Sequence, residues 1–307
     1  MIYDKDNFEY KEPIWFHIPA IFDINALFPF QKSFYNYLIQ HPDRRKNTNF
    51  VVYGCPCSCT WNGGRLMYEP VYSIETVEEM FFNYINNLDM NIQLTFTNRL
   101  LEERDMYDRL GNALLSVANS FPKGQIQVLV SSKILIDHIK ENYPNIELVR
   151  SATMVKKEIT EEEQKIFDAI VLPKWHNKNF NLIKELSKNN ELEILCDEPC
   201  ITDCPRQISH YEAYNVIQLF GKTGQYLTCD QPKHPSYNEL WVLPSEINDY
   251  IDLGVTHFKL SGRESIFHMI ESISLFAFKK EHQASFRMSG AYENLLYIAD
   301  REERRKA

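Results

Sequence analysis

The sequence predicts one (β/α)8 barrel over residues 1–307. Short apolar runs alternate with amphipathic stretches eight times, and no internal repeat or low-complexity segment interrupts them. The length also fits, because a barrel of this kind needs about 250 residues and no linker. An open, doubly wound sheet is the alternative, but no glycine-rich phosphate-binding motif follows the first apolar run.

Each apolar run is short enough for a strand and has a helical pattern behind it. Amphipathic stretches over residues 30–39, 74–88, 102–117 and 133–142 follow the first four runs, and polar or charged helical stretches follow later ones. Residues 302–306 form a charged tail. The eight expected strands are Ile14–Ile18, Phe50–Gly54, Ile92–Phe96, Ile126–Val130, Ile146–Val149, Ala169–Leu172, Leu192–Leu195 and Val255–Leu260.

Composition narrows the class of protein. A formal charge of −9 and a pI near 5.5 argue against a nucleic-acid-binding surface. No N-terminal apolar export signal and no run of about 18 apolar residues occurs, so we expect a cytoplasmic protein without a membrane segment. Seven cysteines in such a protein indicate reduced thiols or metal ligands and not a disulfide framework.

Three cysteines stand in one loop after the seventh run. Cys196, Cys200 and Cys204 have the spacing C-x3-C-x3-C, and the C-x2-C pairs that zinc ribbons favour are absent from the sequence. An iron–sulfur cluster accepts wider spacings plus a distant ligand, for which Cys229 is the natural candidate. The pattern therefore favours a [4Fe–4S] cluster, with zinc or plain buried thiols as alternatives. A radical S-adenosylmethionine motif fits poorly, because the last gap is one residue too long.

Polar residues also follow the other runs, and a barrel places its active site at that end of the strands. Gly63, Gly64 and Arg65 follow Trp61, and Lys259 precedes a second Gly-Arg pair that ends at Arg263. These motifs predict a site for an anionic small molecule or a peptide carboxylate, although each pair is also typical of a tight turn with a surface arginine.

Three further residues are candidates for catalysis. Glu198 is a general base or a simple loop carboxylate, and His210 contacts a cluster sulfur or only sits on its helix. Cys55, Cys57 and Cys59 alternate along a loop, so the first and third face the same way. We expect Cys59 to replace Cys229 as a ligand or to face the substrate as a thiol.

Together these motifs resemble an uncharacterised bacterial family related to the U32 peptidase group. The resemblance rests on the three-cysteine loop followed by Arg206 and Cys229, on the Phe-Lys-x-x-Gly-Arg end of the eighth run, and on the loop after the second run. It spans most of the chain from His17 to Arg263. In that second loop the matching residues are Tyr53, Gly54, Cys59, Trp61, Gly63, Gly64 and Arg65.

The resemblance implies a barrel-like fold and a [4Fe–4S] cluster held by Cys196, Cys200, Cys204 and Cys229. Members of the U32 group carry out oxygen-independent hydroxylation of a quinone precursor or of RNA bases, and a few are called collagenase-like peptidases. The wider group spaces its cysteines differently, and no peptidase nucleophile or catalytic zinc motif is matched here. We therefore expect an iron–sulfur barrel enzyme, and the competing hypothesis is a non-catalytic or peptidase-like barrel with a structural metal.

Overall fold

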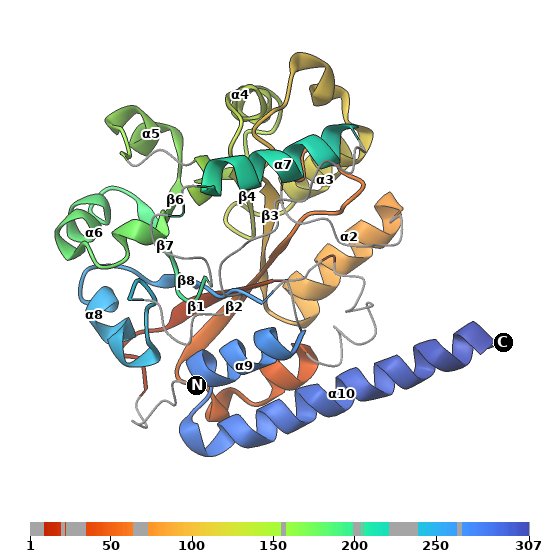
Figure 1. Ribbon diagram of the computed structural model, residues 1–307, viewed down its shortest axis with the longest axis vertical. Coiled ribbons are helices and arrows are strands. Elements are labelled where there is room, and N and C mark those ends of the chain that lie inside the picture. Colours follow the sequence, from red (N-terminus) through yellow and green to blue (C-terminus); the bar gives the residue numbers. More distant parts are fainter. Residues whose placement is uncertain are drawn as a thin grey trace.

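Eight strands form one closed barrel in the computed structural model (Figure 1). They are β1 (Ile14–Pro19), β2 (Thr48–Gly54), β3 (Asn91–Phe96), β4 (Ile126–Val130), β5 (Glu147–Arg150), β6 (Ala169–Leu172), β7 (Glu191–Leu195) and β8 (His257–Lys259). All are parallel and pair in chain order, and β1 also pairs with β8 to close the ring. The predicted (β/α)8 barrel is confirmed. The structure describes residues 9–19, 22, 35–63, 73–154, 158–198, 204, 206–220, 239–262 and 266–306.

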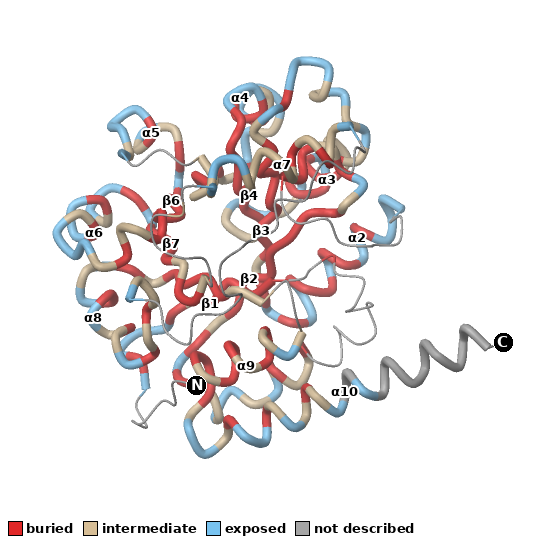
Figure 2. Tube along the Cα trace, viewed as in Figure 1, coloured by how far each residue is buried: buried red, intermediate tan, exposed pale blue. Residues whose placement is uncertain are grey.

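Helices surround the strands, as the alternating pattern predicts. In the described part of the chain they are α2 (Ile74–Phe82), α3 (Arg109–Ser120), α4 (Lys133–Asn142), α5 (Glu161–Ile166), α6 (Phe180–Leu186), α7 (Gln207–Phe220), α8 (Ile247–Ile251), α9 (Ile266–Ala277) and α10 (Lys280–Lys306). Residues 35–40 are also helical. In Figure 2 buried positions concentrate along the strands and exposed positions on the outer helix faces.

One predicted helix is divided in the structure. The pattern over residues 102–117 suggests a single helix, but the chain forms a 3-10 turn at Glu103–Tyr107 before α3 starts. Asp108 causes the break, because its carboxylate accepts a hydrogen bond from the Gly111 N–H at 2.6 Å and caps the new helix. The other carboxylate oxygen accepts from the Thr60 N–H at 2.8 Å, which ties the loop after β2 to α3.

The strands direct alternate side chains outward and inward. Outward residues such as Phe16, Ile194 and Phe258 pack against the helices in the main hydrophobic core. Inward residues divide the barrel interior into two halves. The apolar half comprises Leu129, Val149, Ala169 and Val171, on β4 to β6. The polar half comprises Glu193, His257, Lys259, His17 and Gln93, on β7, β8, β1 and β3, all of them buried.

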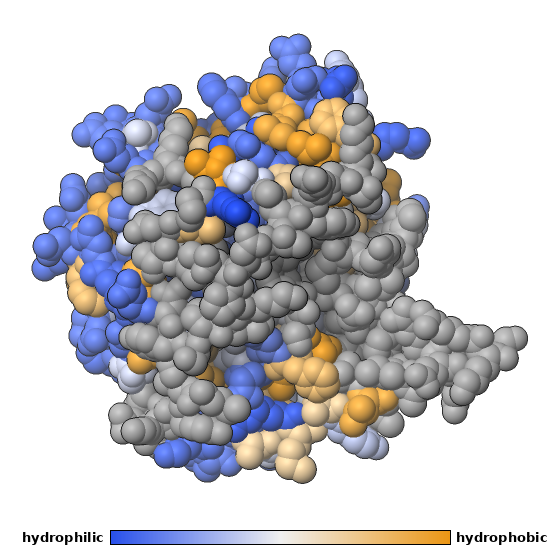
Figure 3. Space-filling view, in the orientation of Figure 1, coloured by the Kyte–Doolittle hydropathy of each residue, from blue (hydrophilic) through white to orange (hydrophobic). Residues whose placement is uncertain are grey.

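The outer surface is mixed in character. Hydrophilic side chains gather over α5 and around α6 on the face shown in Figure 3. α9 and α10 pack side by side beneath the barrel in the view of Figure 1, and α10 continues beyond it. Among the described residues, no helix combines the length and the apolar character that crossing a bilayer requires.

Candidate active site at the mouth of the barrel

A cavity of about 220 Å³ lies at the carboxyl ends of the strands. Its lining includes the apolar side chains of Leu129, Val171 and Leu195 and polar groups such as Lys259 and Ser261. Barrel enzymes place their active sites at this end. The volume is below the roughly 300–1,000 Å³ of pockets for drug-sized ligands, so the cavity suits a small molecule or the end of a peptide.

Helix α7 covers part of this cavity. Its residues His210, Tyr211 and Tyr214 line the cavity, and His210 stacks on Tyr214 with ring centres 5.0 Å apart. At the far end of the helix, the Gln218 side chain donates to the carbonyl oxygens of Cys57 and Cys59 at 2.6 and 2.8 Å. α7 therefore reaches from the loop after β7 to the loop after β2, across the mouth of the barrel (Figure 1).

A second docking contact joins α7 to the loop that contains Gly63. With its amide oriented to satisfy both neighbours, Asn215 donates to the Gly63 carbonyl at 3.1 Å and accepts from the Arg99 N–H at 3.1 Å. Glu212 and Arg99 add an ion pair at 3.9 Å, with both side chains partly exposed. The roof of the cavity is thus fixed to loops that follow β2 and β3.

Asp197 organises one wall of the cavity. Its carboxylate accepts from the Ser261 N–H and from the Ser272 hydroxyl, both at 2.6 Å, and so joins β7, β8 and α9. The Ser261 Oγ lies 3.1 Å from the His268 Nε2, and the same nitrogen lies 3.7 Å from an Asp197 oxygen. The Ser261 hydroxyl also donates to the Asp197 carbonyl at 3.1 Å, so a cavity-lining hydroxyl lies between a backbone carbonyl and an imidazole, the kind of group that can activate a serine.

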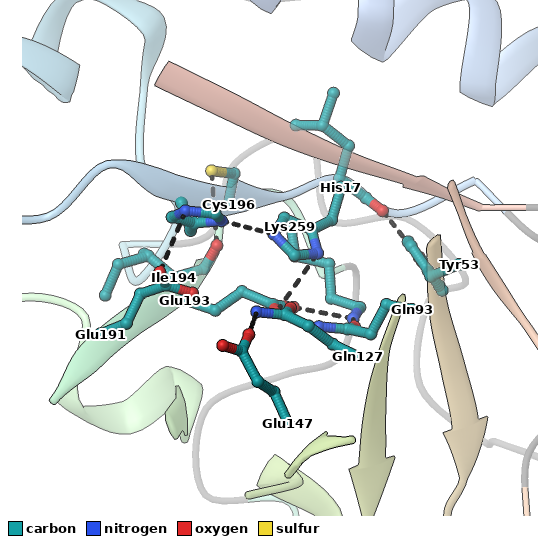
Figure 4. Close-up of polar contacts among 12 residues, drawn as sticks. His17, Tyr53, Gln93, Gln127, Glu147, Glu191, Glu193, Ile194, Cys196 and Lys259 are labelled. Carbon is teal, nitrogen blue, oxygen red and sulfur yellow. Dashed lines mark hydrogen bonds and ion pairs between the residues drawn. The ribbon is translucent and has the colours of Figure 1, made fainter. Parts of the chain in front are cut away.

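Lys259 forms the floor of the cavity, above the polar half of the barrel interior (Figure 4). Its Nζ donates to Glu193 at 2.7 Å and to Gln93 at 2.5 Å, and it lies 4.1 Å from the centre of the Tyr53 ring. Gln93 also donates to the other Glu193 oxygen at 2.7 Å. The Tyr53 hydroxyl donates to the Leu260 carbonyl at 2.8 Å, which fixes the ring under the ammonium.

Two histidines lie below Glu193 in the barrel. The His17 Nε2 is 2.9 Å from the His257 Nδ1, and the His257 ring stacks on Trp15. Burial lowers the pKa of both histidines, that of His257 to about 4. The neighbouring Glu191 carboxyl is 41% exposed, yet its partial burial and the nearby carboxylates raise its pKa to about 7. Both imidazoles are therefore neutral at pH 7.

The free energy of unfolding is expected to fall as the pH drops from 6.5 toward about 4. In this range the histidines of the unfolded chain bind protons that the buried rings do not bind, so acid favours the unfolded state. Urea denaturation across this range should show a shallower fall for His257→Gln than for the parent protein. Parallel profiles for the two proteins would contradict the assignment.

The structure brings four of the predicted site residues together. Gly63, Glu198, His210 and Lys259 all line the cavity. Trp61 instead lies in the hydrophobic core, where its Nε1 donates to the Asp105 carbonyl at 2.7 Å. Gly64, Arg65 and Arg263 lie outside the described residues, so the predicted anion site stays a prediction. The sequence analysis gave no role to Asp197, Ser261, His268 or Glu193, although Ser261 stands directly after the eighth apolar run.

The predicted cluster ligands are described only in part. Cys196 is fully buried in the hydrophobic core, and burial raises the pKa of its thiol. It shares the outward direction of Ile194, so its sulfur lies behind the cavity wall. Cys204 is half-buried just before α7, whereas Cys200 and Cys229 lie outside the described residues.

Within the described ranges, no three histidine, cysteine, aspartate or glutamate side chains are grouped so as to hold a metal ion. Of the four predicted cluster ligands, Cys196 and Cys204 are described, and they lie at the two ends of one loop. Two thiols do not make a cluster site, so the [4Fe–4S] cluster stays a prediction. Cys59 is fully buried and its carbonyl contacts Gln218, whereas the Cys204 carbonyl accepts from Gln207, 11 residues earlier on α7. The Cys59 and Cys204 carbonyls therefore contact opposite ends of α7, and the replacement of Cys229 by Cys59 stays a prediction.

Comparison with known proteins bears on the peptidase part of the resemblance to the U32 group. No protein-family model matches the chain. A protein of Methanocaldococcus jannaschii described as an uncharacterized protease is 28% identical over 154 residues. The match covers 46% of this chain and 45% of that relative, so the chain spans less than half of its length. The relative's description agrees with the peptidase part of the resemblance to the U32 group and does not mention iron or sulfur.

Proposed function

We propose that the protein is an iron–sulfur enzyme that acts on a small molecule or a peptide end in the barrel-mouth cavity. The observation that carries the proposal is the position of the two ends of the cysteine loop, at Glu198 and Gln207. The chain leaves the cavity wall at Glu198 and rejoins it at Gln207, so the segment that contains Cys200 and Cys204 starts and ends at the cavity. A cluster held by this segment would lie beside the substrate.

The residues of the cavity provide binding and proton transfer. A [4Fe–4S] cluster held by the cysteine loop would accept or donate electrons one at a time, the chemistry that an oxygen-independent redox reaction uses. Asp197 keeps the loop fixed to β8, and α7 limits access of water from above. Lys259 presents a cation at the floor, and Glu198 presents a carboxylate at the wall. Arg65 and Arg263 would favour an anionic substrate.

Anaerobic purification tests the cluster directly. The parent protein should be brown and contain iron and acid-labile sulfide in the ratio of a [4Fe–4S] cluster, and Cys200→Ser should lose both. Cys57→Ser is the matched control, because Cys57 is the middle cysteine of the loop after β2 and should leave the colour unchanged. A colourless parent protein with stoichiometric zinc would support a structural metal instead and refute the proposal.

A second candidate function is hydrolysis of a peptide bond, which the Ser261–His268 contact and the protease-named relative favour. In this reaction His268 would take the Ser261 proton while the oxygen attacks the carbonyl carbon. Loss of the nucleophile should reduce kcat on short peptide amides by at least ~1,000-fold in Ser261→Ala. Ser272→Ala is the control, since the Ser272 hydroxyl donates to the Asp197 carboxylate but is not among the residues that line the cavity. Absence of cleavage by iron-loaded parent protein would remove this candidate.

A further inference from the structure

A row of ionisable side chains extends down the barrel interior from the cavity floor. Lys259 contacts Glu193 at 2.7 Å, and the second Glu193 oxygen lies 3.3 Å from the His17 Nδ1 (Figure 4). His17 contacts His257 at 2.9 Å, and the His257 Nε2 lies 3.4 Å from Glu191. Since β7 runs from Glu191 to Leu195, this row starts at the amino ends of the strands and ends at the cavity.

Exposure along the row is lowest at its middle, since the Lys259 side chain at the cavity end is 8% exposed. The side chains of His17 and Glu193 are 0% and 2% exposed, that of His257 is 11% exposed, and that of Glu191 is 41% exposed. Among the described residues of the row, Glu191 is the most exposed, and it lies on the side of the barrel opposite the cavity. Barrel interiors are usually filled by branched apolar side chains, so a buried row of this kind is costly for stability.

We propose that this row is a proton relay between solvent at the amino ends of the strands and Lys259 in the cavity. The inference rests on the proposed function only in assuming that the reaction in the cavity moves protons. Every adjacent pair offers one nitrogen or oxygen that can donate and one that can accept. The His17 Nδ1 makes no hydrogen bond within the described residues, and a Glu193 oxygen lies 3.3 Å from it.

The proton count balances without a charged imidazole. Protonated Glu191 gives its proton to the His257 Nε2 while the His257 Nδ1–H passes to the His17 Nε2. The His17 Nδ1–H passes to the Glu193 carboxylate, and each step forms one bond to hydrogen and breaks one. Lys259 then donates a proton to the substrate and recovers it from Glu193. Both imidazoles change tautomer in this transfer, and a transfer in the reverse direction restores them. The relay therefore suits a lysine that donates a proton in one step and accepts one in the next.

Other titratable groups face the two ends of the row. Glu147 lies near the Glu191 end, where Gln127 donates to it at 3.3 Å, and Asp168 also acts on Glu191 through its charge. Tyr53 faces Lys259 at the cavity end. The low pKa values of both histidines and the raised pKa of Glu191 agree with neutral rings and a carboxyl that carries a proton near pH 7.

Exchange of the buried ring protons with solvent tests the relay. In protein labelled with nitrogen-15 at histidine, the His17 ring N–H should exchange with water much faster than the backbone amides of β1, because the relay carries it to Glu191. Glu191→Gln should slow this exchange at least tenfold, since an amide cannot hand on a proton. Glu185→Gln, at an exposed position of α6, is the matched control and should leave the rate unchanged.

Two outcomes would overturn the relay: ring protons as protected as the β1 amides, or equal rates in Glu191→Gln and the parent protein. The β1 amide protection measured in the same samples shows whether each variant has kept its fold. The readout needs neither a cluster nor a substrate. A colourless protein with fast, Glu191-dependent exchange would therefore refute the iron–sulfur proposal and support the relay.

Discussion

Replacing Lys259 by methionine is expected to lower the free energy of unfolding by about 3–5 kcal/mol, the usual effect of removing one partner from a buried ion pair. The variant leaves the Glu193 carboxylate 2% exposed and without its cation, and Gln93 alone cannot compensate for the charge. Urea denaturation at pH 7 measures the loss. We expect this to be among the most damaging single substitutions in the barrel interior.

A double variant separates the effect of the unpaired charge on stability from the effect of the lost packing. Lys259→Met combined with Glu193→Gln removes the unpaired charge and keeps an amide that Gln93 can still contact, so most of the lost stability should return. If the double variant is as unstable as Lys259→Met, the loss comes from packing and the argument from charge fails. A single variant within ~1 kcal/mol of the parent, as at an exposed pair, would also contradict it.

Gly63→Ala should be nearly as damaging, at about 3 kcal/mol, the upper end of the usual cost of overpacking. A Cβ on Gly63 would lie 2.2 Å from the backbone carbon and oxygen of Thr97 and 2.3 Å from the Asn98 nitrogen. Backbone atoms cannot move aside as a side-chain end can. The shift would also displace the cavity wall and the Asn215 contact. Thermal unfolding and urea denaturation measure the effect.

Gly290→Ala is the matched control for this prediction. Its new Cβ would meet the Cδ1 of Ile270 at 2.9 Å, the far end of a flexible side chain. Gly290 lies within α10, where alanine is favoured over glycine by about 1 kcal/mol. We therefore expect a change close to zero. Equal losses in the two variants would show that the Gly63 contact is not special.

The strands could be predicted well because each one is a short apolar run, and every predicted run overlaps an observed strand. The helix over residues 102–117 was predicted too long. Its break depends on the Asp108 carboxylate, which turns back onto Gly111 and also holds Thr60 from a distant loop. The second contact joins segments far apart in sequence, and periodicity does not report such contacts.

The candidate site was predicted in part for a similar reason. Residues just after the strands, such as Gly63 and Lys259, could be assigned to the cavity because all parallel strands of a barrel end on one face. Glu193 and His257 stand within strands buried on both sides, where composition does not reveal which side chains face inward. The available signal was a pair of ionisable residues two positions apart in β7 and another in β8, because this spacing places both side chains of a pair on the same face of a strand.

The division of the barrel interior has a stereochemical consequence. Leu129 and Val171, on β4 and β6, give the cavity an apolar side, while Tyr53 and Lys259, on β2 and β8 across the ring, give it a polar side. Under the proposed function, a planar substrate with one apolar edge and one hydrophilic edge would bind in a single pose and present only one of the substrate's two prochiral faces to the reactive groups. Product formed in this cavity should accordingly be a single enantiomer.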